Sequence, residues 1–446
     1  MKSFNLGASL AALLVAMPFV TGLSTGQAQT EPATSTFVPF NEFIQNVRET
    51  SSAEVLARPT AQVKDLAALE EMRQHILSMY EGVEVLHSFV YDSQTFDCVP
   101  IAQQPSVRIL GRTNIASEPP SPPPFSPSVE PSDSEPAQAS QLPEDQTQDE
   151  FGNALGCEDQ TIPMSRITLE QLSRFGTLQQ FFEKGPNGAG RAHDPANVEP
   201  PVTAAHKYAY AQQTVDNLGP STNINVWRPH VYTSLNEVFT LAQLWTVGTS
   251  TGPTQTAEAG WQNYPALYGT QNSVLFIYWT ADGYNHTGCY NLTCPGFVQT
   301  SSTVYLGSGF THYSVIGGAQ YEYRLEYYLY QGNWWLWAGN TWAGYYPATI
   351  YGTGQLSRRS NLLQFGSESV GTTVWPQEGS GLFPRRGFRY AAYQRLLYYV
   401  DLSNTSVWDN LTPMSPSPAC YAAGTPGYQT VGGVYFYFGG PGGRGC

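Results

Sequence analysis

The 446-residue sequence has few charged side chains. Asp, Glu, Lys and Arg make up 13% of it, about half of the roughly 25% that is usual in soluble proteins. Helix bundles and coiled coils are rich in Ala, Glu, Lys and Leu, so this composition excludes both. Basic residues are the scarcer kind, with 21 Lys and Arg against 35 Asp and Glu. Because binding to nucleic acid requires a basic surface, we expect no nucleic-acid partner.

Trp and Tyr are almost missing from the first part of the chain. All ten Trp and 26 of the 28 Tyr follow residue 202. Charge divides at the same place: residues 1–202 carry 11 basic and 25 acidic side chains, whereas residues 203–446 carry ten of each. The chain therefore consists of an acidic, aromatic-poor front part and a neutral, aromatic-rich back part.

Long hydrophobic runs are also lacking. After a basic start at Met1-Lys2, residues 6–20 are mostly apolar, and Gly26-Gln27-Ala28 has the small-x-small pattern of a cleavage site. The apolar stretch is too short and too interrupted to span a bilayer. We predict a secretory signal peptide over 1–28 and no membrane-spanning segment in the mature protein.

The front part has two helical patterns around a region of low complexity. Apolar spacing predicts one helix over 65–80 and a second over 169–182, where Thr168 and Gln171 form a capping-box pattern. Residues 116–150 are rich in Pro, Ser, Asp and Glu. Because this composition buries little apolar surface, we predict a disordered insertion there.

In the back part the hydrophobic period changes from 3.6 to 2. Residues 321–330 alternate, Gln331-Gly332-Asn333 forms a turn signal, and 334–337 begin a return strand. This is the pattern of a β-hairpin. Similar runs occur at 274–280, 298–306, 389–400 and 434–438. About 240 residues of short strands predict an all-β fold, a sandwich or a barrel.

Several catalytic motifs are absent or out of context. There is no His-Glu-x-x-His, and His206 and His286 have no partner at metal-ligand spacing, so we expect surface or hydrogen-bonded histidines and no metal or other cofactor. Gly-x-Ser-x-Gly occurs once, at 248–252, but Pro253 follows where a nucleophile elbow needs a helix. We interpret it as a loop.

The six cysteines allow fifteen pairings. Cys289 and Cys294 bracket a short loop, and Cys420 could hold the last residue, Cys446. Cys98 and Cys157 then remain in the front part. An even number of cysteines in an exported chain is typical of structural disulfides.

Carboxylates are the remaining candidates for chemistry. The back part has only six Glu and four Asp. Glu322 and Glu326 alternate with Arg324 on what we expect to be a solvated strand face. Glu258 and Glu368 differ because small residues and aromatics surround them, so both could line a concave face, where desolvation raises a carboxyl pKa.

Longer stretches around these glutamates resemble a known family. They are Glu258-Ala259-Gly260-Trp261, the segment YWTADGY at 278–284, the segment TGCYNLTCPGFVQ at 287–299, and FGGPG at 438–442. In the front part, Asp97-Cys98-Val99 and 156–166 resemble the activation peptide of the same family. This is the neprosin family of glutamic peptidases, and the likeness covers roughly residues 40–110 and 155–446.

The resemblance implies a secreted zymogen of an acid-active endopeptidase that favours cleavage after proline. Its fold would be an antiparallel β-sandwich of two stacked sheets (203–446), preceded by a smaller mixed α+β activation domain (29–202). Carried over by position, the catalytic pair is Glu258 and Glu368. The segment around Glu368 departs from the family's Gly-Gly-Glu-Val by Ser367 and an additional Ser369, which makes Glu378 the nearest competitor.

We expect Trp261, Trp279 and Tyr284 to line the groove and bind the proline ring. The implied partners are proline-containing proteins or peptides and the chain's own propeptide, acting as an inhibitor of a monomeric enzyme. Carboxylates of the acidic front part would bind the groove near neutral pH and loosen as they protonate, with self-processing at about 185–202.

Two other classes of function fit the composition. Glycoside hydrolases on β-sandwiches also use two glutamates in aromatic-lined grooves. A lectin-like binding module would need no catalytic pair. Activity on a soluble polysaccharide would identify a glycoside hydrolase. Ligand binding that survives removal of the glutamates would identify a lectin-like module.

Overall fold

The structure is a computed structural model that describes residues 37–112, 114–116, 118–121, 135–136, 146–184, 206–430 and 432–446. The predicted signal peptide, most of the predicted disordered insertion and the predicted processing segment lie outside these residues. Residues 38–446 belong to one compact unit. Within the described ranges, no helix has the length and apolar character needed to cross a membrane.

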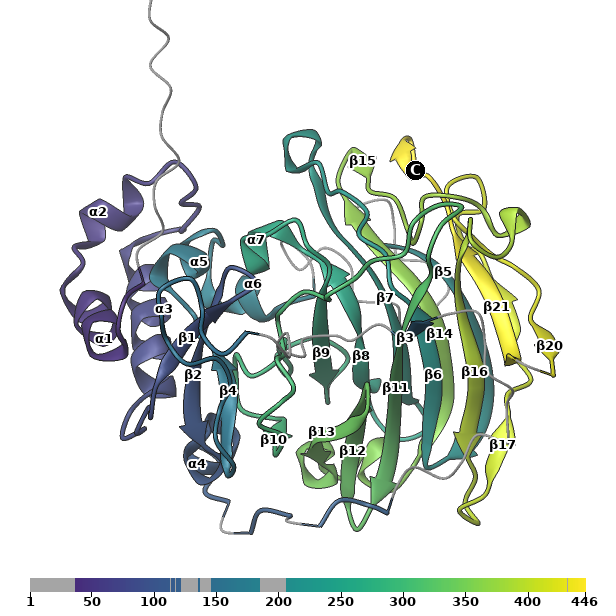
Figure 1. The fold of residues 1–446 in the computed structure, drawn as a ribbon, viewed down its shortest axis with the longest axis horizontal. Helices are drawn as coiled ribbons and strands as arrows, with labels where there is room; N and C mark the ends of the chain where they lie inside the picture. Colours follow the sequence, from purple (N-terminus) through teal and green to yellow (C-terminus); the bar gives the residue numbers. More distant parts are fainter. Residues whose placement is uncertain are drawn as a thin grey trace, which may run out of the picture. The chain divides into compact units, whose positions relative to one another are not determined.

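The front part is a small α+β structure, as predicted. Its sheet has the order β1-β2-β4, and helices gather around it (Figure 1). The strands are β1 (Ser88–Tyr91), β2 (Gln94–Pro100) and β4 (Thr161–Ser165); the helices are α1 (Phe40–Glu49), α2 (Ser52–Leu56), α3 (Leu66–Met79), α4 (Pro105–Arg108), α5 (Leu169–Ser173) and α6 (Leu178–Phe182).

Helix α3 confirms the first predicted helix, and the Asp65 carboxylate caps it by accepting from the Ala68 backbone N–H. The second predicted helix is two helices, α5 and α6. Thr168 caps α5 as expected, but Thr177 caps α6 in the same way by accepting from Gln180 N–H. The second cap, directly after Gly176, explains why one continuous helix was the wrong prediction.

Residues 146–150, which we predicted to be disordered, instead form part of a turn. The Asp149 carboxylate accepts hydrogen bonds from the backbone N–H groups of Val90, Phe151 and Asn153. These bonds connect the turn to β1, and they lower the pKa of Asp149 against the raising effect of partial burial. A single well-placed carboxylate thus orders a segment whose composition favours disorder.

Two antiparallel sheets form the back part (Figure 1). The smaller sheet has the order β18-β5-β14-β7-β8-β9, and the larger one follows the path β10-β13-β12-β11-β6-β16-β21-β19. The strands of the smaller sheet are β5 (His206–Asn217), β7 (Glu237–Gly248), β8 (Gln255–Asn263), β9 (Val274–Thr280), β14 (Ser360–Gly371) and β18 (Thr412–Met414). Those of the larger are β6 (Gly219–Asn225), β10 (Val298–Gln299), β11 (Tyr321–Tyr330), β12 (Asn333–Ala338), β13 (Thr341–Pro347), β16 (Ala392–Val400), β19 (Ala422–Ala423) and β21 (Gly433–Gly439), with β3 (Glu135–Pro136), β17 (Ser406–Trp408) and β20 (Gly427–Gln429) pairing at its side. The remaining elements are helix α7 (Pro265–Tyr268) and the pair β15 (Val374–Trp375) and β22 (Gly443–Arg444).

The predicted all-β class is confirmed, and most predicted strands occur. Strand β9 matches 274–280, and β11 and β12 form the predicted hairpin around Gln331 and Gly332, both at positive φ as a two-residue turn requires. The predicted strand at 298–306 was too long, because only β10 pairs there. The run after β10 forms turns instead, in which Gln299 donates to the Ser301 and Val304 carbonyls.

The two sheets contact each other through buried side chains. The Trp261 indole on β8 donates to the Asn225 carbonyl on β6 at 3.0 Å, and the Tyr327 hydroxyl on β11 donates to the Glu258 carbonyl at 3.0 Å. These contacts give the two-layer packing expected of a sandwich.

The other face of the larger sheet is not the solvated surface that we expected. Glu322 and Glu326 are buried. Glu322 accepts from Arg395 and Glu326 from Arg324, so the charge alternation along β11 marks buried glutamates that are paired with partly exposed arginines.

Candidate active site

Strand register places Glu258 and Glu368 on one face of the smaller sheet. Strand β7 lies between β8 and β14, with Trp245 opposite Glu258 and Leu241 opposite Glu368. Side chains of directly paired residues point to the same side of a sheet. Two glutamates 110 positions apart in the sequence are therefore separated by a single strand.

One ammonium group holds both carboxylates. Lys184 Nζ lies 2.5 Å from Glu258 Oε2 and 2.8 Å from Glu368 Oε2, and all three side chains are buried. The two Oε2 atoms are consequently no farther apart than the sum of these distances. Lys184 follows α6, so it comes from the front part of the chain.

The second oxygen of each carboxylate has other partners. Glu258 Oε1 accepts from the hydroxyls of Thr256 and Tyr284, each at 2.7 Å. Glu368 Oε1 lies 2.6 Å from Nδ1 of His206. With the outer oxygens engaged in this way, the Oε2 atoms are the pair that faces a common point, and Lys184 occupies that point.

These contacts determine the charge state of the cluster. Burial alone would raise the pKa of Glu368, but the Lys184 charge and the hydrogen bond from His206 lower it to about 2. Burial likewise opposes the charge of Lys184, yet the two glutamates raise the pKa of its ammonium. A buried cation between two buried anions is thus stable only while all three are present.

Aromatic rings surround Lys184. Nζ lies 5.7 Å from the ring centre of Trp245 and 5.9 Å from that of Tyr278, whose hydroxyl donates to the Phe182 carbonyl at 3.2 Å. Such cation–π contacts add to the electrostatic stabilisation of a desolvated ammonium.

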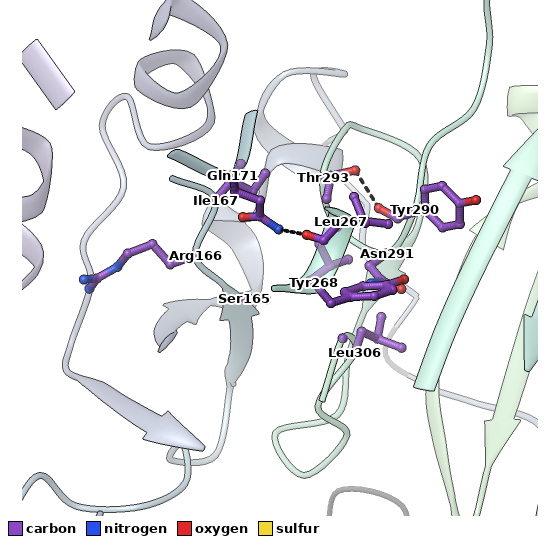
Figure 2. Close-up of a pocket in the computed structure, with 12 residues that line it drawn as sticks. Ser165, Arg166, Ile167, Gln171, Leu267, Tyr268, Tyr290, Asn291, Thr293 and Leu306 are labelled. Carbon is purple, nitrogen blue, oxygen red and sulfur yellow. Dashed lines mark hydrogen bonds between the residues drawn. The ribbon is translucent and has the colours of Figure 1, made fainter. Parts of the chain in front are cut away.

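Other hydrogen bonds also attach the front part to the back part. The Gln104 amide donates to the Gln299 carbonyl and accepts from its N–H, both at 2.9 Å. Figure 2 shows a second contact region, where Gln171 donates to the Leu267 carbonyl. The cavity beside this bond measures about 20 Å³, room for one water molecule, so it is not a substrate site.

A comparison with known protein families adds independent evidence at this point. The family model described as Neprosin matches residues 236–441, a range that includes both glutamates. This match supports membership of the chain in the neprosin family and, at family level, a neprosin-type peptidase.

Among the three aromatic residues predicted to line the groove, only Tyr284 donates a hydrogen bond to one of the two glutamates. Trp261 faces the opposite side of β8 and packs between the sheets, 1% exposed. Trp279 pairs with Ala257 and packs against Tyr346 and Tyr351. Both predictions were wrong because position 258 differs from 257 and 261 in strand parity.

The sequence analysis missed five residues that contact the two glutamates or Lys184: Trp245, Thr256, Tyr278, Lys184 and His206. The period of two along β8 could have identified Thr256. Trp245 and Tyr278 required knowledge of the strand pairing. His206 is the hydrogen-bonded kind of histidine that we considered, and no sequence signal marks Lys184.

Glu378, the competitor of Glu368, lies on the other side of β14. It accepts from Ser367 Oγ at 2.6 Å and from Ser369 Oγ at 2.9 Å, the two residues that flank Glu368 and point away from it. Burial raises the Glu378 pKa to about 8, despite the serine hydrogen bonds and helped by the charge of Glu368. The two serines that depart from the family pattern therefore belong to one buried network with Glu378.

The disulfides are Cys98–Cys157, Cys289–Cys294 and Cys420–Cys446. This is the pairing suggested by sequence. None of them takes part in the glutamate cluster, and Cys289–Cys294 closes the loop after β9.

Replacing Lys184 tests the charge cluster. We expect Lys184→Met to lower the free energy of unfolding at pH 7 by about 3–5 kcal/mol, because two buried carboxylates lose their cation. Glu368 has a depressed pKa, so this stabilisation is present above the unfolded value near 4.3 and disappears as pH falls toward about 2. Urea unfolding at pH 7 and pH 3 measures the difference. The exposed Lys64→Met is the control, and an equal effect of Lys184→Met at both pH values would contradict the assignment.

Replacing Glu378 tests the neutral carboxyl. Its folded pKa is raised, so the wild type should lose stability as pH rises from about 4.3 to about 8. Glu378→Gln keeps the shape of the neutral form without titrating. We expect its stability relative to wild type to increase by on the order of 4 kcal/mol between pH 4 and pH 8, measured by unfolding across that range. Glu322→Gln, which removes a charge bonded to Arg395, should instead be destabilising near neutral pH. Parallel pH profiles for wild type and Glu378→Gln would show that Glu378 is ionised.

Proposed function

We propose that this protein is a secreted zymogen of a glutamic endopeptidase that cleaves after proline at acid pH. The observation that carries the proposal is the single ammonium shared by Glu258 and Glu368. A group within hydrogen-bonding distance of both carboxylates marks a position where a water molecule could bind both in the active enzyme. The three disulfides suit an oxidising, extracytoplasmic location.

In the proposed reaction, water replaces Lys184 Nζ between the two Oε2 atoms. The ionised carboxylate takes a proton from this water as its oxygen attacks the scissile carbonyl carbon, and the protonated carboxyl donates to the carbonyl oxygen. The resulting diol then collapses. Its C–N bond breaks, the first glutamate gives its proton to the leaving nitrogen, and a diol hydroxyl returns a proton to the second. The products are a carboxylic acid and an amine.

This chemistry requires the pair to carry one proton. Two carboxylates so close together cannot easily both be charged without a cation, so removal of Lys184 should raise the pKa of one of them. The pair would then share a proton at acid pH.

Latency follows from the same contacts, although not in the way that the acidic front part had indicated. The group that the front part places between the catalytic residues is an ammonium, not a carboxylate. Acid weakens this contact because protonation of the glutamates removes the charges that hold Lys184. The front part would then act as an inhibitory propeptide that is released at low pH.

The glycoside hydrolase alternative has one observation in its favour. The Oε2 atoms of Glu258 and Glu368 are close enough for the roughly 5–5.5 Å separation typical of retaining glycosidases. The Neprosin match favours peptide hydrolysis. A lectin-like module would not need two carboxylates buried around one cation.

Replacement of either glutamate tests the mechanism. We expect Glu258→Gln and Glu368→Gln each to abolish cleavage after proline, since neither amide can complete the proton cycle. Mass spectrometry of a protein-mixture digest at low pH measures this, with circular dichroism to verify folding. Glu378→Gln is the matched control that should remain active, and full activity of Glu258→Gln or Glu368→Gln would remove that residue from the mechanism.

Acid incubation tests the zymogen. We expect the full chain to shorten at about pH 3, with cleavage within 185–202, and Glu258→Gln to stay intact under the same conditions. Gel electrophoresis and N-terminal sequencing follow the reaction. A wild-type preparation that is active at pH 3 with no change in size would contradict propeptide release by cleavage.

A further inference from the structure

Gln243 lies between the two glutamates on the same face of the smaller sheet. It is on β7, two residues from Trp245, which pairs with Glu258, and two residues from Leu241, which pairs with Glu368. Residues two apart on a strand point to the same side. The Gln243 side chain is therefore a diagonal neighbour of both glutamates, at a distance that long side chains can span.

Both direct cross-strand neighbours of Gln243 are glycines. Gly260 on β8 and Gly366 on β14 pair with it. A Cβ atom at Gly260 would lie 2.6 Å from Gln243 Cβ and 2.0 Å from the Ala242 carbonyl oxygen. A side chain at position 260 would thus displace Gln243, and neither glycine has a side chain that could bond to the amide.

The Gln243 amide has no hydrogen-bond partner in the described part of the chain. Its side chain is fully buried, and neither Nε2 nor Oε1 makes a hydrogen bond with any described residue. Gln262, on the same face of β8, shows the usual arrangement, since its Oε1 accepts from the Tyr268 hydroxyl and its Nε2 donates to the Tyr290 hydroxyl. A buried polar atom without a partner costs roughly 1–3 kcal/mol.

A cost of this kind in a well-packed sheet points to a partner that arrives later. The scissile carbonyl must bind beside the water position between the Oε2 atoms. The carbonyl oxygen gains negative charge as water attacks, and it needs a neutral donor that does not compete with the glutamates for the shared proton. A glutamine amide is such a donor at every pH, and Gln243 is located between the two carboxylates.

We propose that Gln243 is a third catalytic residue, whose Nε2 donates a hydrogen bond to the oxygen of the scissile carbonyl. This inference rests on the proposed peptidase function. In the latent form the amide has no hydrogen-bond partner among the described residues, and in the active form the substrate supplies an acceptor. The stabilisation applies mainly to the transition state, where the oxygen carries the most charge.

The test is Gln243→Met, which has a similar volume but no donor. Since loss of an oxyanion donor typically costs 100- to 1000-fold in kcat, we expect a fall of that size, with KM changed less than about threefold. The melting temperature of the latent chain should be unchanged or higher, because two unpaired polar atoms are removed. Wild type and Gln243→Met are both activated in trans by immobilised wild-type enzyme, which is then removed. Their kinetics are measured with a proline-containing peptide at acid pH.

Gln262→Met is the matched control. It removes a glutamine from the same face whose amide has two partners, so it should lower the melting temperature while kcat stays within a few-fold of wild type. This combination is the reverse of the one expected for Gln243→Met. A purely structural Gln243 would behave like Gln262.

Wild-type kcat in Gln243→Met would overturn the proposal, and so would a Gln243→Met chain that does not fold, because either result would assign Gln243 no catalytic role. Gln243→Asn, which keeps the amide but withdraws it by one methylene, should also lose kcat. Glu258→Gln in the same assay separates the two hypotheses. If Glu258→Gln is active, the proposed peptidase mechanism fails; if it is inactive while Gln243→Met is active, only the role of Gln243 fails.

Discussion

The contact of the Lys184 ammonium with Glu258 and Glu368 is the constraint on which the rest of this structure depends. Two buried carboxylates in hydrogen-bonding range of one point repel each other unless a cation or a proton lies between them. In the described chain the cation is supplied by the front part. The same electrostatic requirement underlies both parts of the proposed function: the latent form at neutral pH and the shared proton at low pH.

Sheet geometry makes this contact possible. Strand β7 separates the two glutamate-bearing strands by one position, and pairing fixes which residues share a face. The glycines on both sides of Gln243 offer its amide no side-chain partner. In the described part of the chain, the two glutamates on this face therefore have hydrogen-bond partners, whereas the Gln243 amide has none.

The carboxyls of this protein also show how the environment decides protonation. Glu368 and Glu378 are equally buried, yet the pKa of the first is lowered to about 2 and that of the second is raised to about 8. The first has a cation and a histidine as partners, whereas the second has two serine hydroxyls. A neutral Glu378 below the strand is compatible with an ionised Glu368 above it, because two negative charges across one strand would repel.

The sequence by itself predicted the all-β class and the α+β front part, suggested the disulfide partners, and singled out Glu258 and Glu368 as a candidate pair. Local spacing, composition and family-like segments carry this information. Only the tertiary structure decided which other residues surround the two glutamates. Trp261 and Trp279 are in the core because their side chains point to the opposite face of the sheet from Glu258. Lys184, His206 and Gln243 are near the glutamates because the fold brings distant segments together. No periodicity encodes such contacts, because the register of one strand against another arises from packing of the whole sheet.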